Sequence, residues 1–410
     1  MNIKTAFILA FTLMFVNVGS SQELSSYEKP VEKAIFSPIL DDTVKLEIII
    51  PVNLILSNYT DYPVIYLFDR QNGINYDYSL HSIDYLTSIS AIPRSIIVGI
   101  SLNNSVRGKW TNPNISGGKA DDFITFLIDE FYPVLKEDYP VSSFNLMIGH
   151  SRTAIFSSYA LSRNFDFFNG AIASSTADFD FGDKYQKLQF EEFLDTIATA
   201  PNDYYLYFST GEKRYGDTHE PRVDIFNAYL LDQDLPANFH WKYYKENVGH
   251  FVIPGLTVNR ALSEIFTNYR DVLWNCFKIV NDSTYADNVP WEKYLEQYRL
   301  VSENMGYPLR PDMLFFNSIA SSYQNDYNNH FGDNKFKYAL IVLLEAIKTY
   351  PNNYDLSSWI GEIYMTQGDS KNGMMYLDKT IELINNDESL SKQEKENVVK
   401  EVTQNIQEKK

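Results

Sequence analysis

The sequence predicts an α/β fold with a doubly wound, mainly parallel sheet, followed by a smaller all-helical region. Over residues 32–279, short apolar runs alternate with helical patterns, and this alternation is typical of a parallel sheet covered by helices on both faces. After Asn281 the apolar runs stop, and helical patterns continue to the end of the chain. A chain of 410 residues is long enough for two or three domains.

The predicted strands are short runs rich in β-branched and aromatic residues. They occupy residues 45–50, 63–68, 95–100, 145–149, 170–174, 204–208 and 239–244. A continuous apolar run of this kind indicates a strand that is buried on both faces. Helices are predicted at residues 121–136, 154–161 and 222–231, where apolar side chains recur at steps of three and four.

Residues 1–21 are predicted to be an export signal. Lys4 precedes an apolar run over residues 6–16, and small residues follow up to Ser21, which is the order of a cleavable signal peptide. The run is too short to span a bilayer as a mature helix, and no later run is longer. We therefore expect a periplasmic or secreted protein whose mature chain has no membrane span.

The charge and the cysteine content exclude several classes of protein. Acidic residues outnumber basic ones by 53 to 35, which gives a net charge of −18. A nucleic-acid-binding surface needs clustered Lys and Arg, so we expect no nucleic-acid partner. The single cysteine, Cys276, excludes an intramolecular disulfide and a thiolate metal cluster. Because no cofactor motif occurs either, we expect neither a metal nor a cofactor.

Residues 282–410 are predicted to form a helical region that resembles tetratricopeptide repeats. Two segments align at an offset of 34 residues, and this helix-turn-helix period is the one those repeats have. The aligned pairs are Ala339 with Gly373, Leu343 with Leu377, and Ala346 with Thr380. The charged tail from Asp387 to Lys410 is predicted to be a capping helix or a frayed end.

The strongest local signal for chemistry is the segment Gly149-His150-Ser151, which lies between a predicted strand and a predicted helix. A nucleophile elbow has this context, because a tight turn there exposes a serine hydroxyl above the sheet. The usual pattern is Gly-x-Ser-x-Gly, but Thr153 occupies the last position. We expect its β-branched side chain to lie where the turn normally packs against a neighbouring strand.

A nucleophilic serine needs a general base, and the chain has six histidines. His150 lies in the turn itself, so we expect its side chain to face away from the hydroxyl of Ser151. His250 lies in a loop after the last predicted strand and before a helix, where the order Ser, acid, His places the base. We therefore predict that His250 is the base.

The acid is expected in the loop after the strand at residues 204–208. Glu212 and Asp217 are the candidates there, with Glu220 third, and we favour Glu212 because it is nearest to the strand end. A Ser–His pair without a nearby acid is a further alternative. The oxyanion hole is predicted to use the backbone N–H groups of Arg152 and of the loop around Arg70.

At this point the sequence resembles the esterase D and enterochelin-esterase-like branch of the α/β-hydrolases, over about residues 32–281. Matching segments are Asp61-Tyr-Pro-Val-Ile-Tyr-Leu-Phe-Asp69, Ile92-Pro-Arg-Ser-Ile-Ile-Val-Gly-Ile100 with Arg107, Gly149-His-Ser151 and Phe167-Phe-Asn-Gly-Ala-Ile-Ala173. The resemblance implies serine ester hydrolysis without a metal, on substrates such as siderophore lactones or sugar-linked acyl esters. Arg70, Thr153 and Ala154 replace glycines of the family pattern. Exported members with a C-terminal tetratricopeptide-like region are also similar to this chain.

We therefore expect an exported serine esterase with a signal peptide at 1–21, a hydrolase domain at 22–281 and a helical region at 282–410. Its partner is a small-molecule ester. The alternative is a degenerate hydrolase fold that binds a protein partner through its tetratricopeptide-like region. A calcium-dependent interpretation of Asp178-Phe-Asp-Phe-Gly-Asp183 is weaker, because that segment lacks the twelve-residue calcium-loop pattern.

Overall fold

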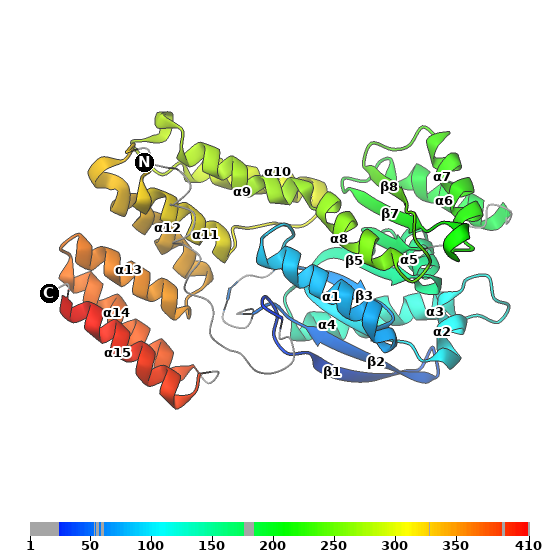
Figure 1. The fold of residues 1–410 in the computed structure, drawn as a ribbon, viewed down its shortest axis with the longest axis horizontal. Helices are drawn as coiled ribbons and strands as arrows, with labels where there is room; N and C mark the ends of the chain where they lie inside the picture. The colour runs from blue at the N-terminus through cyan, green and yellow to red at the C-terminus, as the bar shows by residue number, and fades with distance from the viewer. Residues whose placement is uncertain are drawn as a thin grey trace.

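The computed structural model describes residues 24–408, except residues 53, 55–56, 59–60, 176–183, 328 and 388–389. The predicted signal peptide and the segment Asp178–Asp183 lie outside the described residues. A sheet flanked by helices forms one part of the molecule, and a group of helices forms the other part (Figure 1). No helix among the described residues is long and apolar enough to cross a bilayer.

The sheet has eight strands, and it confirms the prediction of a mainly parallel sheet. Its order is β1-β2-β4-β3-β5-β6-β7-β8. β1 pairs with β2 and β2 with β4 in antiparallel fashion, whereas all the remaining pairs are parallel. The strands are β1 (Val31–Ser37), β2 (Asp42–Ile49), β3 (Tyr62–Leu67), β4 (Ile96–Ser101), β5 (Val141–His150), β6 (Gly170–Ser174), β7 (Tyr204–Thr210) and β8 (Phe239–Lys245).

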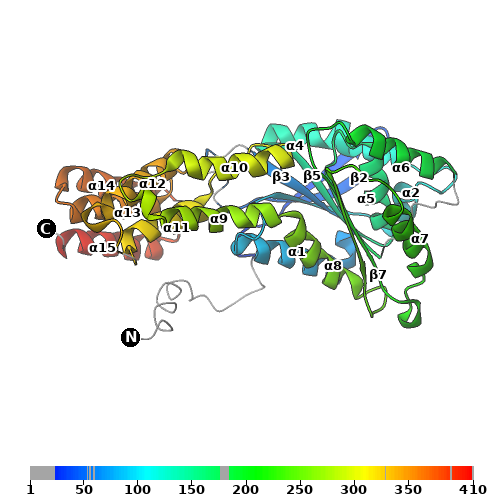
Figure 2. The ribbon, with the colours of Figure 1, turned by 90° about the horizontal axis from the view of Figure 1, so that it is seen from above.

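Helices cover both faces of the sheet, as Figure 2 shows. Successive side chains of a strand point to opposite faces, so Ile65 and Leu67 of β3 pack into one apolar cluster, and Val64 and Tyr66 pack into the other. The first face carries α1 (Gly73–Ser88) and α8 (Ile253–Ile265). The opposite face carries α2 (Asn104–Thr111), α3 (Ala120–Thr125), α4 (Tyr132–Asp138), α5 (Arg152–Arg163), α6 (Lys184–Ile197) and α7 (Glu220–Leu231).

The helix predicted at residues 121–136 is present but not uniform. Its middle, Phe126–Phe131, is a π-helical segment between α3 and α4. Phe123, Phe126 and Phe131 are all fully buried, and their rings are stacked in sequence. A π-helical turn contains one residue more than an α-helical turn, so it rotates the side chains that follow relative to the apolar core. The spacing of apolar residues in the sequence does not reveal this change.

The helical region and the sheet share one apolar core. α9 (Thr267–Val280) follows α8, and the elements after it are α10 (Trp291–Met305), α11 (Met313–Asn325), α12 (Lys335–Thr349), α13 (Tyr354–Thr366), α14 (Ser370–Asn386) and α15 (Lys392–Glu408). Phe144 of β5 contacts the rings of Phe266 and Tyr307. One apolar cluster therefore extends from the sheet to α13. The division at residue 281 and the repeat interpretation stay predictions.

Two glycines bring α13 and α14 close together. A Cβ on Gly361 would lie 2.7 Å from Cγ of Leu377, and a Cβ on Gly373 would lie 2.6 Å from Sδ of Met365. Real Cβ atoms do not approach this closely, so a Cβ at either position would require the side chain of Leu377 or Met365 to move. Gly373 and Leu377 are two of the aligned positions in the 34-residue repeat, and both are buried.

We predict that Gly361→Ala separates these helices and lowers the free energy of unfolding of the helical region by about 1–3 kcal/mol. Denaturant titration followed by circular dichroism measures this change. Lys371→Ala, at an exposed position of α14, is the matched control and should change it by less than about 0.5 kcal/mol. Equal stability of the two variants would contradict the packing argument.

Candidate active site

Ser151 occupies a strained turn between β5 and α5. Its backbone has φ 61° and ψ −115°, which is unfavourable for a residue with a Cβ. Its N–H donates to the carbonyl oxygen of Ser174 at the end of β6, at 2.9 Å. A Cβ on Gly149 would lie 2.4 Å from the carbonyl oxygen of Thr153, so only glycine lets the chain turn this tightly. This is the geometry of a nucleophile elbow, at the position predicted from the sequence.

Thr153 does not pack as an apolar side chain in the elbow. It is fully buried, and its Oγ1 donates a hydrogen bond of 2.6 Å to Oδ2 of Asp69. The same oxygen accepts from the backbone N–H of His150 at 2.9 Å. The hydroxyl of Thr153 therefore joins the elbow to the loop after β3, a contact that the sequence analysis did not predict.

Asp69 collects several donors in a buried position. Its backbone is left-handed, with φ 67°, and its side chain forms a bidentate pair with Arg107 at 2.6 and 2.8 Å. Nε2 of Gln71 donates to Oδ1 at 2.9 Å. Arg107 also donates to the carbonyl oxygen of His150 at 3.0 Å. This carboxylate therefore fixes the loop after β3, helix α2 and the elbow relative to one another.

The two predicted oxyanion donors lie on the segments that Asp69 joins. Arg152 is the first residue of α5, and Arg70 begins the short 3₁₀ helix η1 (Arg70–Asn72). N–H groups at helix starts have no intrahelical acceptor, so both are available to a ligand. The Arg70 side chain forms ion pairs with Glu32 and Glu47, and the Arg152 guanidinium lies against Gly108.

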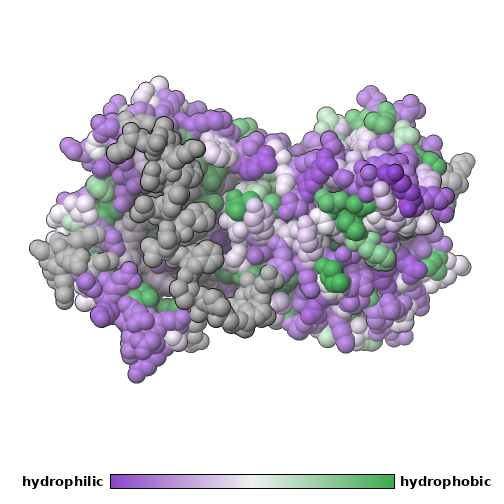
Figure 3. All heavy atoms as spheres, in the orientation of Figure 1, coloured by the Kyte–Doolittle hydropathy of each residue, from purple (hydrophilic) through white to green (hydrophobic). Residues whose placement is uncertain are grey.

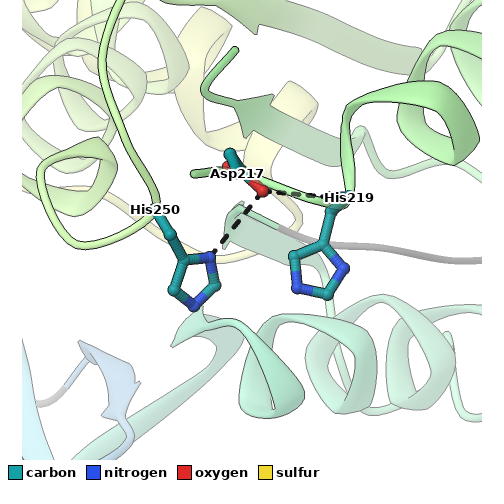
Figure 4. A group of neighbouring side chains, drawn as sticks. All are labelled: Asp217, His219 and His250. Atoms are coloured by element: carbon teal, nitrogen blue, oxygen red, sulfur yellow. Dashed lines mark hydrogen bonds and ion pairs between the residues drawn. The ribbon is translucent and has the colours of Figure 1, made fainter. Parts of the chain in front are cut away.

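The structure brings Asp217 and His250 together at the ends of β7 and β8 (Figure 4). Oδ1 of Asp217 lies 3.8 Å from Nδ1 of His250. Two glycines permit this approach of the two loops. A Cβ on Gly211 would lie 2.2 Å from the carbonyl oxygen of Val248, and a Cβ on Gly249 would lie 2.3 Å from that of Tyr215.

Glu212, the acid that we favoured, points elsewhere. Its carboxylate pairs with Arg214 of the 3₁₀ helix η3 (Lys213–Tyr215). Glu220 also lies apart, since it pairs with Lys245 at 2.9 Å. Of the three carboxylates in this loop, Asp217 is the one that approaches His250.

Ser175 lies between Asp217 and His250, and no pattern in the sequence indicated this position. Its Oγ is 2.6 Å from Oδ2 of Asp217 and 2.7 Å from Nδ1 of His250. Ser175 directly follows β6, is fully buried and has a positive φ of 51°. A serine at the end of an apolar run is too common in sequences to suggest such a position.

Asp217 is anchored as a carboxylate. Burial alone would raise its pKa, but interactions with His250, Ser175 and the backbone N–H groups of Gly211 and His219 hold the pKa well below its usual range. The N–H of Gly211 donates to Oδ2 at 2.8 Å, and that of His219 donates to Oδ1 at 3.1 Å. Asp217 therefore stays ionised at neutral pH.

Two further histidines surround His250. The ring of His150 lies 4.6 Å from that of His250, and the ring of His219 lies 5.3 Å from it. Burial and the neighbouring His250 lower the pKa of His150 to about 4, and burial lowers the pKa of His219. Nε2 of His150 donates to the carbonyl oxygen of His250 at 3.0 Å, so His150 holds the loop that carries His250.

Asp217, His219 and His250 also form the one group of potential metal ligands found among the described residues. Their ligand atoms lie within 4.8 Å of one another, and Figure 4 shows both imidazole rings on the same side of Asp217. Both oxygens of Asp217 already accept hydrogen bonds from the protein. Because its oxygens already accept these hydrogen bonds, Asp217 is better placed to orient His250 than to bind a cation.

A small cavity of about 20 Å³ lies beside the elbow. The loop after β3, helix α1, the elbow and helix α8 line it, with Asp69, Tyr76, His150 and Pro254 among its walls. Exposed apolar side chains follow His250: Phe251 is 78% exposed and Val252 54%. Figure 3 shows apolar surface over the region of α8.

This arrangement defines an α/β-hydrolase: an elbow serine, with a histidine and a carboxylate on neighbouring loops at the same edge of the sheet. The chain matches the Esterase family, described as "Putative esterase", over residues 37–298. The chain belongs to this family and is a carboxylic ester hydrolase. The match extends past residue 281 into α10.

Solved structures share the fold. An IroE-like serine hydrolase from Shewanella oneidensis is 17% identical, with a TM-score of 0.60, over 77% of this chain and 98% of that one. An uncharacterised protein from Capnocytophaga ochracea is 14% identical, with a TM-score of 0.54, over 92% of this chain and 100% of that one. No curated protein matches the sequence.

We predict that Thr153→Val destabilises the protein by about 1–3 kcal/mol, because the buried Asp69 and the N–H of His150 each lose a partner. Thr153→Ser keeps the hydroxyl and should cost less. Thermal or denaturant unfolding measures the difference between the two variants. If valine proves no worse than serine, the hydroxyl does not hold the elbow.

We also predict that Asp217→Asn lowers kcat about 10³- to 10⁴-fold, as loss of the orienting carboxylate does in Ser–His–Asp triads. Glu212→Gln is the matched control and should have little effect, since its pair with Arg214 lies near the surface. Steady-state kinetics on one ester distinguishes the two. The reverse ranking would restore Glu212 as the acid.

Proposed function

We propose that the protein hydrolyses carboxylic esters through Ser151, His250 and Asp217, by way of an acyl-enzyme. The observation that carries this proposal is that the elbow with the strained, half-buried Ser151 lies beside the loop of His250, because the rings of His150 and His250 are 4.6 Å apart. His250 in turn faces the buried, ionised Asp217. Family membership supports the reaction class, and the geometry supports the assignment of roles.

In this mechanism His250 takes the proton from Oγ of Ser151 as the oxygen attacks the ester carbonyl. The negative charge that forms on the carbonyl oxygen is held by the backbone N–H groups of Arg152 and Arg70, and each such donor contributes about 3 kcal/mol to transition-state stabilisation. His250 then returns the proton to the leaving alcohol. Water, activated by the same histidine, releases the acid and restores Ser151.

Among the described residues no hydrogen bond joins Oγ of Ser151 to His250. Catalytic hydrogen bonds are often long before substrate binds and shorten in the reacting complex. The base is nevertheless held in place from two sides, by Asp217 with Ser175 at Nδ1 and by His150 at its carbonyl oxygen.

The exposed apolar side chains beside His250 support an ester with an apolar or aromatic portion. Phe251 contacts the ring of His250 with its centroid at 5.1 Å, and Tyr215, on the neighbouring loop, is half-exposed. Trp110, another aromatic residue of the hydrolase part, has no such role because it is buried in the core against Phe123. Siderophore esters and sugar-linked acyl esters both contain such groups, and we propose these two substrate classes.

We further propose that the protein acts in the periplasm or outside the cell, on the strength of the signal-like residues 1–21. The tetratricopeptide-like helices are proposed to stabilise the hydrolase, because they share its apolar core. A protein partner bound through residues 282–410 is the alternative role for this region.

We predict that the mature protein hydrolyses short-chain p-nitrophenyl esters and that Ser151→Ala and His250→Ala each lower kcat by at least about 10⁴-fold, because the members of such a site act as a unit. Initial rates measure this directly. A fluorophosphonate probe followed by peptide mass spectrometry should label Ser151 in the parent protein.

Each variant must keep the circular dichroism spectrum of the parent, which shows that it is folded. A folded parent that neither turns over esters nor takes the label at Ser151 would contradict the proposal. That result would favour a binding protein on a degenerate hydrolase fold.

A further inference from the structure

We propose that Ser175 is a positioning residue that connects Asp217 to His250 and selects the tautomer of the base. The inference rests on the proposed function, and it deepens that function by assigning a fourth residue to the site. The distances carry it: Asp217 and His250 are 3.8 Å apart at their nearest ion-pair atoms, whereas Oγ of Ser175 is within 2.7 Å of both.

The direction of this hydrogen-bond chain follows from its end groups. A serine hydroxyl has one proton to donate, and an ionised carboxylate can only accept. Asp217 is ionised, and it already accepts from two backbone N–H groups, so the Ser175 hydroxyl donates to Oδ2 of Asp217. The lone pair that remains on Oγ then faces Nδ1 of His250.

Because Oγ of Ser175 can only accept at this second contact, Nδ1 of His250, 2.7 Å away, has to be the donor. Nδ1 of His250 must therefore carry a proton, which leaves Nε2 as the unprotonated nitrogen. That is the tautomer a general base needs, since the second nitrogen of such a histidine takes the proton from serine. No proton has to move along the chain, because Nδ1 keeps its proton when Nε2 accepts one from Ser151.

The backbone holds Ser175 in this place at some cost. Its φ of 51° is unusual for serine, and strained positions of this kind persist where the surrounding structure determines them. Its N–H lies 3.4 Å from Oγ of Ser209, which accepts from Thr257 of α8 at 2.7 Å. Hydrogen bonds thus connect the end of β6 to the end of β7 and to α8, close to His250.

The alternative is that Asp217 contacts His250 directly and that Ser175 only fills space. A direct hydrogen bond needs the distance between Oδ1 of Asp217 and Nδ1 of His250 to shorten from 3.8 Å to about 3 Å. Asp217 is held at both oxygens by the backbone of its own loop, which opposes this movement. The two arrangements predict different results when the hydroxyl is removed.

The test compares Ser175→Ala with Ser158→Ala, a buried serine of α5 whose Oγ donates only to the helix backbone at 3.2 Å. We expect Ser175→Ala to lower kcat/KM about 10- to 100-fold, a part of the roughly 10²- to 10⁴-fold that general-base catalysis contributes. The acidic limb of its pH–rate profile should move to lower pH, because the imidazolium loses a hydrogen-bonded partner. Ser158→Ala should show neither change.

A double-mutant cycle with Asp217→Asn measures the connection itself. If Ser175 transmits the effect of Asp217, the double variant is no slower than Asp217→Asn alone. Independent, multiplicative losses would overturn the inference. So would a Ser175→Ala enzyme with the parent rate and pH profile, because Asp217 would then reach His250 unaided.

A measurement without catalysis keeps this test separate from the proposed function. In protein labelled with ¹⁵N-histidine, the ring resonances of His250, assigned by their loss in His250→Ala, should report the Nδ1–H tautomer in the parent and in Ser158→Ala. In Ser175→Ala that population should fall. An unchanged tautomer would overturn the role of Ser175 even if the enzyme is active, whereas an inactive enzyme with the expected tautomers would count against the proposed function alone.

Discussion

The carboxylate of Asp69 is the interaction on which the site depends. It accepts from Arg107 of α2, from Gln71 of its own loop and from Thr153 of the elbow, and so it joins three segments that are far apart in the chain. A buried carboxylate costs several kcal/mol unless charged and hydrogen-bonding partners compensate it. The three segments are therefore held in place, because moving any one of them would leave the buried carboxylate of Asp69 without a partner. The two candidate oxyanion donors lie on the segments that it joins, so their separation is set before a substrate arrives.

Asp217 serves the other half of the site in the same way. It is buried as Asp69 is, but backbone N–H groups of its own loop hold it, whereas side chains hold Asp69. Like Asp69, it contacts a neighbouring element through a hydroxyl. Thr153 connects Asp69 to the elbow, and Ser175 connects Asp217 to the base. A hydroxyl both donates and accepts, so each can satisfy a carboxylate and still orient a second group. The substitution of threonine for a family glycine is thus compensated by a specific partner, Asp69, within the same structure.

The sequence was sufficient for what local patterns determine. The strand runs follow from apolar periodicity, and the structure has each of them within a few residues of its predicted bounds. The turn at Ser151 and the loop of His250 follow from the order of motifs along the chain, and the catalytic roles of the two residues stay predictions. The choice between Glu212 and Asp217 could not be made this way. It depends on where the loop after β7 crosses the loop after β8, and that crossing is decided by close contacts of Gly211 and Gly249 with backbone far away in sequence. Ser175 was missed for the same reason.

The histidines around His250 also bear on the proposed catalysis, because they are neutral at neutral pH. When His250 becomes an imidazolium, any cation within a few ångströms raises its energy. His150 is the nearest ring, and burial together with His250 lowers its pKa to about 4; burial lowers the pKa of His219 as well. Both rings therefore favour the neutral form at neutral pH, and the ionised Asp217 remains the nearest charge to the base. An ionised Asp217 beside His250, with His150 and His219 neutral, favours positive charge on His250 in the proposed mechanism.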